Sequence, residues 1–213
     1  MPIYVATNSA DTWQNPKLFC FDKHLKIKSV AGCPPDYFSK TGQLWGNVLY
    51  DWKELERTNY SWWINRVKHS FLLYDILRLD HFRGFASYWA IRYGEKTAIN
   101  GRWEIGPRIQ FFRDLERKVK NIDIIAEDLG TLTADVFKLL RQTNYPNMKV
   151  LQFGLTEWDN MYNPKNYTEN SVAYTGTHDN MSMVEWYSTL NKNEKFICDE
   201  NLKNFLKIIC IFQ

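Results

Sequence analysis

Short apolar runs alternate along the chain with longer amphipathic segments, and this alternation constrains the fold more than any other feature. Five apolar runs are expected to form strands, at residues 3–6, 77–80, 122–126, 149–153 and 171–175. Helical patterns follow or separate them, at residues 60–75, 107–119, 134–142, 181–190 and 192–212. Strands that alternate with helices predict an α/β fold with a parallel sheet and crossover connections. The sequence begins inside the first expected strand, which indicates a piece of a longer protein.

One long segment interrupts this pattern after the first expected strand. Residues 15–50 are rich in proline and glycine and are expected to form a loop, and long loops in compact domains are commonly functional. The segment also carries a group of aromatic and amide side chains: Tyr37, Phe38, Gln43, Trp45 and Asn47. Rings stack on the apolar faces of sugars and amides bond to hydroxyls, so this mixture suits an uncharged polyol ligand. A structural loop packed by its own aromatics is the alternative.

Charge and composition exclude several classes of function. The 27 basic and 24 acidic residues are interspersed and give a net charge of +3, with no basic stripe that could follow a nucleic-acid backbone. No run of about 18 apolar residues predicts a membrane span, and the first residues do not resemble a signal peptide. The four cysteines show no paired spacing, as is typical of reduced thiols. We therefore expect a cytoplasmic protein without nucleic-acid or membrane partners.

Acidic residues follow three of the expected strands. Asp80 ends the second strand, Glu127 follows the third, and Asp179 follows the fifth within the sequence Gly-Thr-His-Asp-Asn. In parallel α/β folds, the chemistry lies beyond the carboxyl ends of the strands. Acids at such positions are costly unless they are used or paired. The pattern therefore predicts a carboxylate-based active site at one rim of the sheet.

Retaining cleavage of a glycosidic bond needs such a set of groups. One carboxylate acts as the nucleophile, and one carboxylic acid protonates the leaving oxygen, at a separation of about 5 to 5.5 Å. Arg78 lies two residues before Asp80, so strand alternation puts both side chains on one face, where the guanidinium would keep the aspartate ionised. Glu127 should be less well compensated and should keep its proton. We therefore expect Asp80 as nucleophile and Glu127 as acid.

Each of these motifs also has a purely structural interpretation. Arg78 and Asp80 could form a structural ion pair, and Glu127 could cap the helix that follows it. His178 and Asp179 could be a hydrogen-bonded structural pair. The combination of three acidic strand ends favours a functional site over three independent coincidences.

Taken together, several stretches resemble the amylomaltase, or disproportionating-enzyme, family of 4-α-glucanotransferases (glycoside hydrolase family 77). They are residues 2–13, 31–47, 78–85, 124–130, 148–154 and 174–180. The resemblance implies that Asp80 is the nucleophile, Glu127 the general acid and base, and Asp179 a third carboxylate that binds sugar hydroxyls. It further implies that Arg78 and His178 flank them. The residues of the 31–50 loop would cover the acceptor side and favour a sugar over water.

The resemblance also implies an architecture and a reaction. The fold would be a partial (β/α)₈ barrel, roughly its strands 3 to 7, in a catalytic domain at 1–190 with a helical tail at 191–213. The reaction would transfer segments of α-1,4-glucans or maltooligosaccharides to a sugar acceptor, through a covalent glucosyl-aspartate, without cofactor or metal. An α-amylase-type hydrolase and an inactive fragment are the alternatives that stay open.

Overall fold

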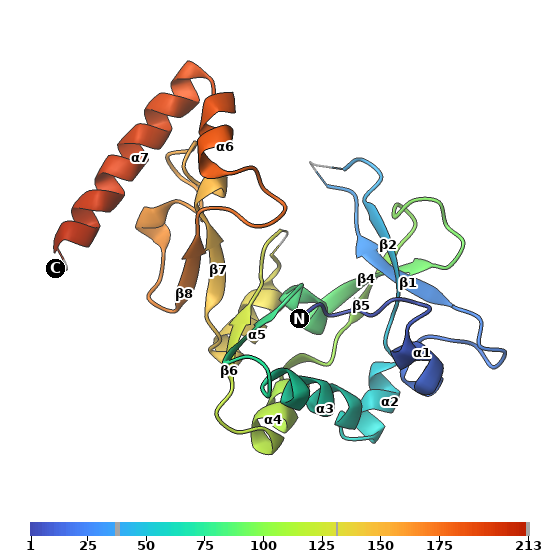
Figure 1. The fold of residues 1–213 in the computed structure, drawn as a ribbon. Coiled ribbons are helices and arrows are strands. Elements are labelled where there is room, and N and C mark those ends of the chain that lie inside the picture. The colour runs from blue at the N-terminus through green and yellow to red at the C-terminus, as the bar shows by residue number, and fades with distance from the viewer. Residues whose placement is uncertain (37–38, 131, 212–213) are drawn as a thin grey trace. The chain divides into compact units, whose positions relative to one another are not determined.

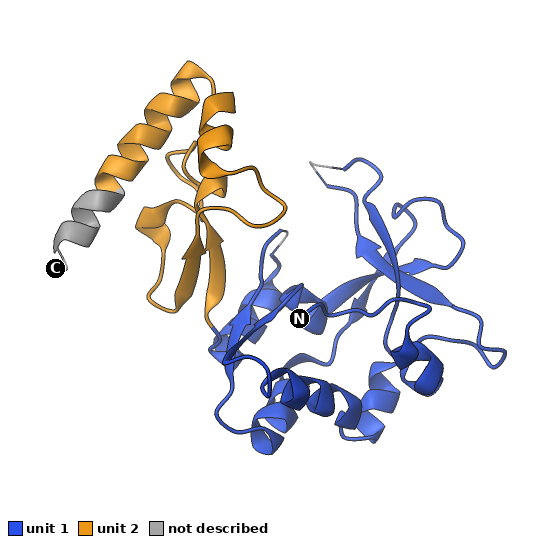
Figure 2. Ribbon diagram, in the orientation of Figure 1, with its two compact units in different colours: residues 1–145 blue, residues 146–213 orange. Residues whose placement is uncertain are grey.

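The computed structural model describes residues 1–36, 39–130 and 132–211, the last seven of these by their backbone alone. The chain divides into two compact units, Met1–Tyr145 and Pro146–Gln213 (Figures 1 and 2). The domain boundary expected at residue 190 falls inside the second unit, between two of its helices. Each unit is described below by itself.

A pair of parallel strands forms the part of the first unit that the sequence predicted best. Strand β3 (Ile76–Leu79) pairs with β6 (Asp123–Ala126), with Ile76 opposite Asp123 and Leu79 opposite Ala126. Helices α4 (Arg108–Lys118) and α5 (Ala134–Thr143) lie within about two residues of their predicted bounds. Helix α3 (Ser61–Ser70) ends five residues before its predicted end, and the three residues Leu72, Leu73 and Tyr74 are exposed.

The first expected strand, at residues 3–6, is absent, although its burial was predicted correctly. Ile3, Tyr4 and Val5 are buried, but only Met1 bonds to β3: its ammonium donates to the Arg78 carbonyl at 2.6 Å, and its carbonyl accepts from the Asp80 N–H at 3.0 Å. Pro2 has no N–H with which to continue a ladder.

Side chains bond to this segment where a neighbouring strand would otherwise do so. Arg66 donates to the Pro2 carbonyl at 2.9 Å, Tyr50 to the Ile3 carbonyl at 2.7 Å and Asn47 to the Val5 carbonyl at 3.1 Å. Main-chain carbonyl groups in a folded chain need partners, and here side chains on α3, on β2 and just after β2 supply them. The segment is therefore held in the core as extended chain without being a strand.

The 15–50 segment contains more regular structure than the expected loop. Helix α1 (Ala10–Gln14) comes directly before it, and within it lie a 3₁₀ turn η1 (Pro16–Leu18) and the antiparallel strands β1 (Ser29–Cys33) and β2 (Gln43–Val48). Strands β4 (Ser87–Arg92) and β5 (Arg102–Ile105) were not predicted. They join β1 and β2 in an antiparallel sheet of order β2-β1-β4-β5.

Glycine accounts for the misinterpretation of that segment. A Cβ at Gly32 would lie 2.2 Å from the Gln43 carbonyl oxygen, so this glycine permits the close approach of β1 and β2. Gly42 has a φ of 67°, the left-handed region that suits a turn before β2. Glycines that indicate loops in the sequence here allow two strands to pair and turn.

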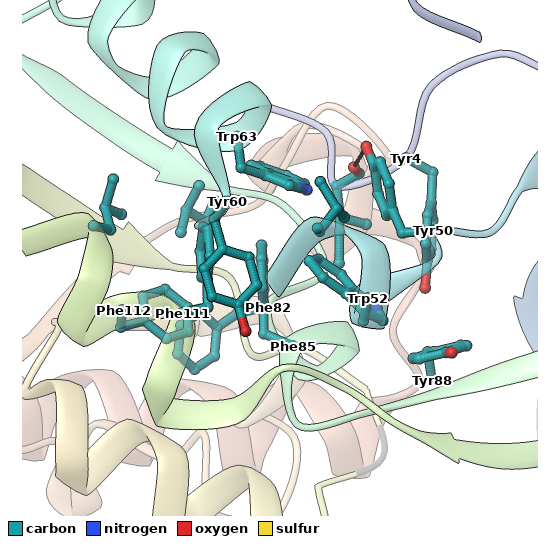
Figure 3. Close-up of a cluster of buried hydrophobic side chains, with 14 of the residues drawn as sticks. Tyr4, Tyr50, Trp52, Tyr60, Trp63, Phe82, Phe85, Tyr88, Phe111 and Phe112 are labelled. Atoms are coloured by element: carbon teal, nitrogen blue, oxygen red, sulfur yellow. Dashed lines mark hydrogen bonds between the residues drawn. The ribbon is translucent and has the colours of Figure 1, made fainter. Parts of the chain in front are cut away.

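The core of the first unit is built largely from aromatic rings. Phe85 stacks on Phe111 with ring centroids 5.2 Å apart, and Trp63 meets the edge of both rings at 5.4 and 5.6 Å (Figure 3). Trp63 lies on α3, Phe85 on the 3₁₀ turn η2 (Phe82–Phe85) and Phe111 on α4, and α2 (Trp52–Arg57) adds Trp52. All three rings are inaccessible to solvent, so much of the aromatic excess serves packing.

The second unit has its own parallel pair. Strand β7 (Asn147–Val150) pairs with β8 (Ser171–Tyr174), and the latter part of the fourth expected strand is instead a 3₁₀ turn, η3 (Leu151–Phe153). A second turn, η4 (Pro164–Asn166), precedes β8. Helices α6 (Met183–Thr189) and α7 (Lys192–Ile211) come after β8. Within the described residues, no helix is long and apolar enough to cross a membrane.

Candidate active site

Asp80 and Arg78 form the ion pair that strand alternation predicted. The Nη1 of Arg78, on β3, donates to the Oδ1 of Asp80, the residue directly after β3, at 2.6 Å. The Asp80 side chain is 42% exposed, so it is bonded to Arg78 and still open to solvent. A charge-assisted bond of this length restrains the carboxylate without burying it.

Glu127 lies in the opposite environment. The residue is 8% exposed, and its carboxylate accepts from two main-chain N–H groups, those of His81 at 2.5 Å and Leu129 at 2.9 Å. Burial raises the pKa of Glu127, and the charge of Asp80 raises it further, whereas the two N–H bonds and Arg78 oppose the shift. The net effect is a raised pKa, which favours a protonated acid.

The parallel pair of β3 and β6 brings Asp80 and Glu127 to one rim. Each residue comes directly after an aligned pair, Leu79 and Ala126, and neighbouring strands lie about 4.7–4.9 Å apart. The Glu127 N–H donates to the Leu79 carbonyl at 3.0 Å, and the Glu127 carbonyl accepts from the Phe82 N–H at 2.9 Å. The residues that follow β3 and β6 are therefore joined by main-chain hydrogen bonds, and the predicted spacing of the two carboxyl groups stays a prediction.

The expected binding residues of the 31–50 segment have different surroundings. Trp45 is 36% exposed on β2, and its indole N–H donates to the Gln43 Oε1 at 3.0 Å. Asn47 directs its amide N–H to the Val5 carbonyl, so this side chain fixes the position of β2 relative to residues 3–6. Tyr37 and Phe38 lie outside the described residues. Gln43 and Trp45 are thus available on the surface of the first unit, whereas Asn47 is engaged.

Two residues that the sequence analysis did not select lie at this rim. The ring of His81 meets the edge of the Trp45 ring at 4.8 Å, and Tyr4 lies 6.4 Å from each of these two rings. Burial, followed by the charge of Arg83, lowers the pKa of His81 to about 4, so its imidazole is neutral at pH 7. The position of His81 directly after Asp80 was the available signal.

The second unit carries Asp179 and His178 on an open turn. Their side chains are 80% and 79% exposed and 3.4 Å apart. The turn is organised by Asn180, whose Oδ1 accepts from both the N–H and the hydroxyl of Thr177 at 2.8 Å. Gln152, also missed in the sequence, supports it by donating to the Met181 carbonyl at 2.9 Å. The turn therefore presents the side chain of Asp179 to solvent beside the His178 ring.

Comparison with known proteins identifies the family. The sequence profile of the 4-α-glucanotransferase family matches residues 1–207. A 4-α-glucanotransferase of Clostridium butyricum is 50% identical over 197 residues, covering 92% of this chain and 40% of that protein. The chain belongs to the 4-α-glucanotransferase family. Within this family it resembles the solved amylomaltase from Streptococcus agalactiae in complex with acarbose, with a TM-score of 0.91, 38% identity, and coverage of 95% of this chain and 41% of that one.

The family members that match are longer than this chain. It spans about 40% of the Clostridium butyricum protein and 34% of a 47% identical relative from Solanum tuberosum. That relative is named a chloroplastic/amyloplastic 4-α-glucanotransferase, so a cytoplasmic location stays a prediction for this chain. Within the described residues, no group of three or more His, Cys, Asp or Glu side chains is arranged to hold a metal ion.

Proposed function

We propose that this chain carries the reacting groups of a 4-α-glucanotransferase, which passes segments of α-1,4-glucans from a maltooligosaccharide donor to a sugar acceptor. The observation that carries this proposal is the contrast between two neighbouring carboxyl groups, Asp80 paired with Arg78 and Glu127 buried with a raised pKa. Two carboxyl groups whose environments separate their protonation states form an acid and nucleophile pair. Membership of the family supports the same assignment.

In the first step, an oxygen of the Asp80 carboxylate attacks the anomeric carbon of the donor. The glycosidic C–O bond breaks, and the leaving oxygen takes the proton of Glu127, so the shortened glucan departs with a free 4-hydroxyl. The result is a covalent glucosyl-Asp80 ester with inverted configuration and an ionised Glu127. The bond from Arg78 at 2.6 Å orients the Asp80 carboxylate for the attack.

In the second step, Glu127 removes the proton from the 4-hydroxyl of an incoming sugar. That oxygen attacks the anomeric carbon, the bond to Asp80 breaks, and the second inversion restores the original configuration. Glu127 ends protonated and Asp80 ends ionised, so both groups are ready for another cycle. The two steps need proton and electron-pair transfer only.

Asp179 and His178 complete the proposed site by binding hydroxyls of the reacting sugar. Their exposure on the turn after β8 supports this role, since a carboxylate that is open to solvent can accept bonds from a ligand. We further propose that both parallel pairs belong to a partial (β/α)₈ barrel, roughly its strands 3 to 7. The likeness to the Streptococcus agalactiae amylomaltase supports this architecture.

The 31–50 segment is proposed to cover the acceptor side of the site. Trp45 and Gln43 offer a ring and an amide for a sugar. Tyr37 and Phe38, outside the described residues, are proposed to join this surface, whereas the amide N–H of Asn47 is bonded to the Val5 carbonyl and leaves its Oδ1 as the group that a sugar could bond to. Transfer and hydrolysis share the first step and differ only in what attacks the glucosyl-enzyme. A surface that excludes water and stacks on an incoming sugar favours transfer.

The purified chain incubated with maltotriose tests the proposal. Transfer releases glucose and forms longer maltooligosaccharides with little net rise in reducing ends, and Asp80→Asn abolishes both products. A rise in reducing ends equal to the glycosidic bonds broken would indicate a hydrolase instead. Absence of any product, under conditions in which a longer family member turns over, would contradict activity of this chain.

A further inference from the structure

His81 joins two parts of the proposed site through two different groups. Its main-chain N–H donates to the Glu127 Oε2 at 2.5 Å, whereas its imidazole ring meets the edge of the Trp45 ring at a centroid distance of 4.8 Å and an interplanar angle of 85°. The first contact holds the acid, and the second holds a ring proposed to guide the acceptor.

The backbone at His81 is unusual and fixes the direction of both groups. Its φ of 53° and ψ of 49° lie in the left-handed region, which non-glycine residues adopt only at some cost. This conformation turns the main-chain N–H toward Glu127 directly after Asp80. It also begins the 3₁₀ turn η2, in which the Gly84 N–H donates to the His81 carbonyl at 2.9 Å.

Packing restricts the imidazole ring on its other sides. Tyr4 lies 6.4 Å from it and stacks on Tyr50 at 6.0 Å, and Tyr50 is fully buried in the core. A Cβ at Gly84 would lie 3.1 Å from the ring, so the absence of a side chain there leaves room for it. The ring is also neutral at pH 7, because burial lowers its pKa, and edge-to-face contact with an indole requires no charge.

The His81 ring is a close neighbour of the Trp45 ring. Trp45 lies on the exposed part of β2, where its indole N–H donates to the Gln43 Oε1 at 3.0 Å, and it is followed by Gly46 with a φ of 79°. Among the described residues, the His81 ring at 4.8 Å lies nearer to Trp45 than the Tyr4 ring at 6.4 Å. The His81 ring therefore limits the orientations that the indole can take.

We propose that His81 is a positioning residue that holds the Trp45 ring in register with Glu127 and thereby favours a sugar over water as the acceptor. This inference rests on the proposed transferase function. His81 acts through Trp45 and its own main chain. The sugar that attacks the glucosyl-enzyme must meet the Glu127 carboxylate and the Trp45 ring at once, so a fixed separation between them selects a stacked acceptor over water.

Substitutions can remove the ring while keeping the main chain. His81→Asn retains a residue that tolerates the left-handed region, His81→Gly relaxes the backbone, and both keep the N–H that donates to Glu127. His81→Phe restores an aromatic ring. His69→Asn, at an exposed position on α3, is the matched control. Trp45→Ala removes the proposed acceptor surface itself.

The first measurement is the ratio of hydrolysis to transfer with maltotriose. We expect His81→Asn and His81→Gly to raise this ratio by roughly three- to tenfold, the factor that loss of one aromatic contact produces. Trp45→Ala should raise it at least as much, whereas His81→Phe should restore it and His69→Asn should leave it unchanged. An unchanged ratio in His81→Asn, with Trp45→Ala showing the rise, would overturn the role in acceptor choice.

The second measurement does not depend on activity. The indole N–H resonance of Trp45 in a ¹H–¹⁵N spectrum, assigned through Trp45→Phe, should shift and broaden in His81→Asn and His81→Gly and recover in His81→Phe. A Trp45 resonance that stays unchanged in His81→Asn would overturn the proposal. If the wild-type chain neither transfers nor hydrolyses, the proposed function fails, and this resonance alone decides whether His81 holds Trp45.

Discussion

The carboxyl groups of Asp80 and Glu127, in the first unit, differ from that of Asp179, in the second, in their hydrogen-bond partners and their exposure to solvent. In the first unit, Asp80 has a guanidinium at 2.6 Å and Glu127 has two main-chain N–H donors and little exposure. In the second unit, Asp179 is 80% exposed, with the His178 ring at 3.4 Å. The first unit thus bonds both of its carboxyl groups to protein donors and raises the pKa of Glu127, whereas the side chain of Asp179 stays open to solvent.

The largest expected effect comes from the nucleophile. Asp80→Asn should lower kcat/KM for maltotriose disproportionation by roughly 10⁴-fold or more, as loss of a nucleophile does in other covalent mechanisms. Asp123→Asn is the matched control, because Asp123 is an exposed aspartate at the opposite end of β6 from Glu127. If Asp80→Asn retained transfer activity, the ion pair of Arg78 and Asp80 would be structural and not catalytic.

Removal of the acid should have the next largest effect. Glu127→Gln should lower the transfer rate by about 10²- to 10⁴-fold with natural glucan donors, because the leaving oxygen then lacks its proton. A donor with a good leaving group, such as a glucosyl fluoride, should lose much less in its first step, since that step needs no protonation. Equal losses with both donors would assign Glu127 a role other than that of general acid.

Asp179→Asn tests the exposed carboxyl group of the second unit. We expect a loss of about 10²- to 10³-fold in kcat, typical for removal of one group that stabilises a transition state. The urea midpoint of unfolding should stay at the wild-type value, because the Asp179 side chain is 80% exposed and lies 3.4 Å from an equally exposed His178. A large fall in the midpoint would mean that Asp179 is a structural residue after all.

The smallest and most specific effect concerns the pKa of Glu127. Titration of ¹³C-labelled glutamate carboxyl groups by NMR should give this residue a midpoint above its ordinary value of 4.5, because burial disfavours the charged form. Asp80→Asn should lower that midpoint, since the raising charge of Asp80 is lost while the lowering charge of Arg78 remains. If Asp123→Asn shifted the titration midpoint of Glu127 by the same amount, the shift would not depend on the nearby charge of Asp80.

The raised pKa of Glu127 also makes the free energy of unfolding depend on pH. The folded protein holds the Glu127 proton to a higher pH than the unfolded chain does, so this group's contribution to stability is complete below about pH 4.5. It is lost as the pH rises through the folded pKa. Urea unfolding of the wild type and of Asp80→Asn across this range should show a smaller loss in the variant.

Local sequence patterns predicted much of the fold but gave the wrong assignment in two regions, residues 3–6 and residues 15–50. Strands β3, β6 and β8 and helices α4 and α5 were found because short apolar runs and helical periodicity report directly on burial. Residues 3–6 have the same apolar run yet form no strand, because Pro2 lacks a donor and side chains of Arg66, Tyr50 and Asn47 take the place of a neighbouring strand. The strands β1 and β2 were missed because Gly32 and Gly42 indicate a loop in the sequence.

Three features of the site could be read from the sequence: acidic residues follow three expected strands, Arg78 and Asp80 share a face, and the order of the motifs resembles that of α-glucan transferases. Strand alternation and motif order are local properties of a chain, so they need no folded structure. The burial of Glu127 with its two N–H bonds, the bond from Asn47 to Val5 and the contact of His81 with Trp45 became visible in the fold alone. Desolvation and ring contacts depend on residues far apart in the chain, which meet when it folds.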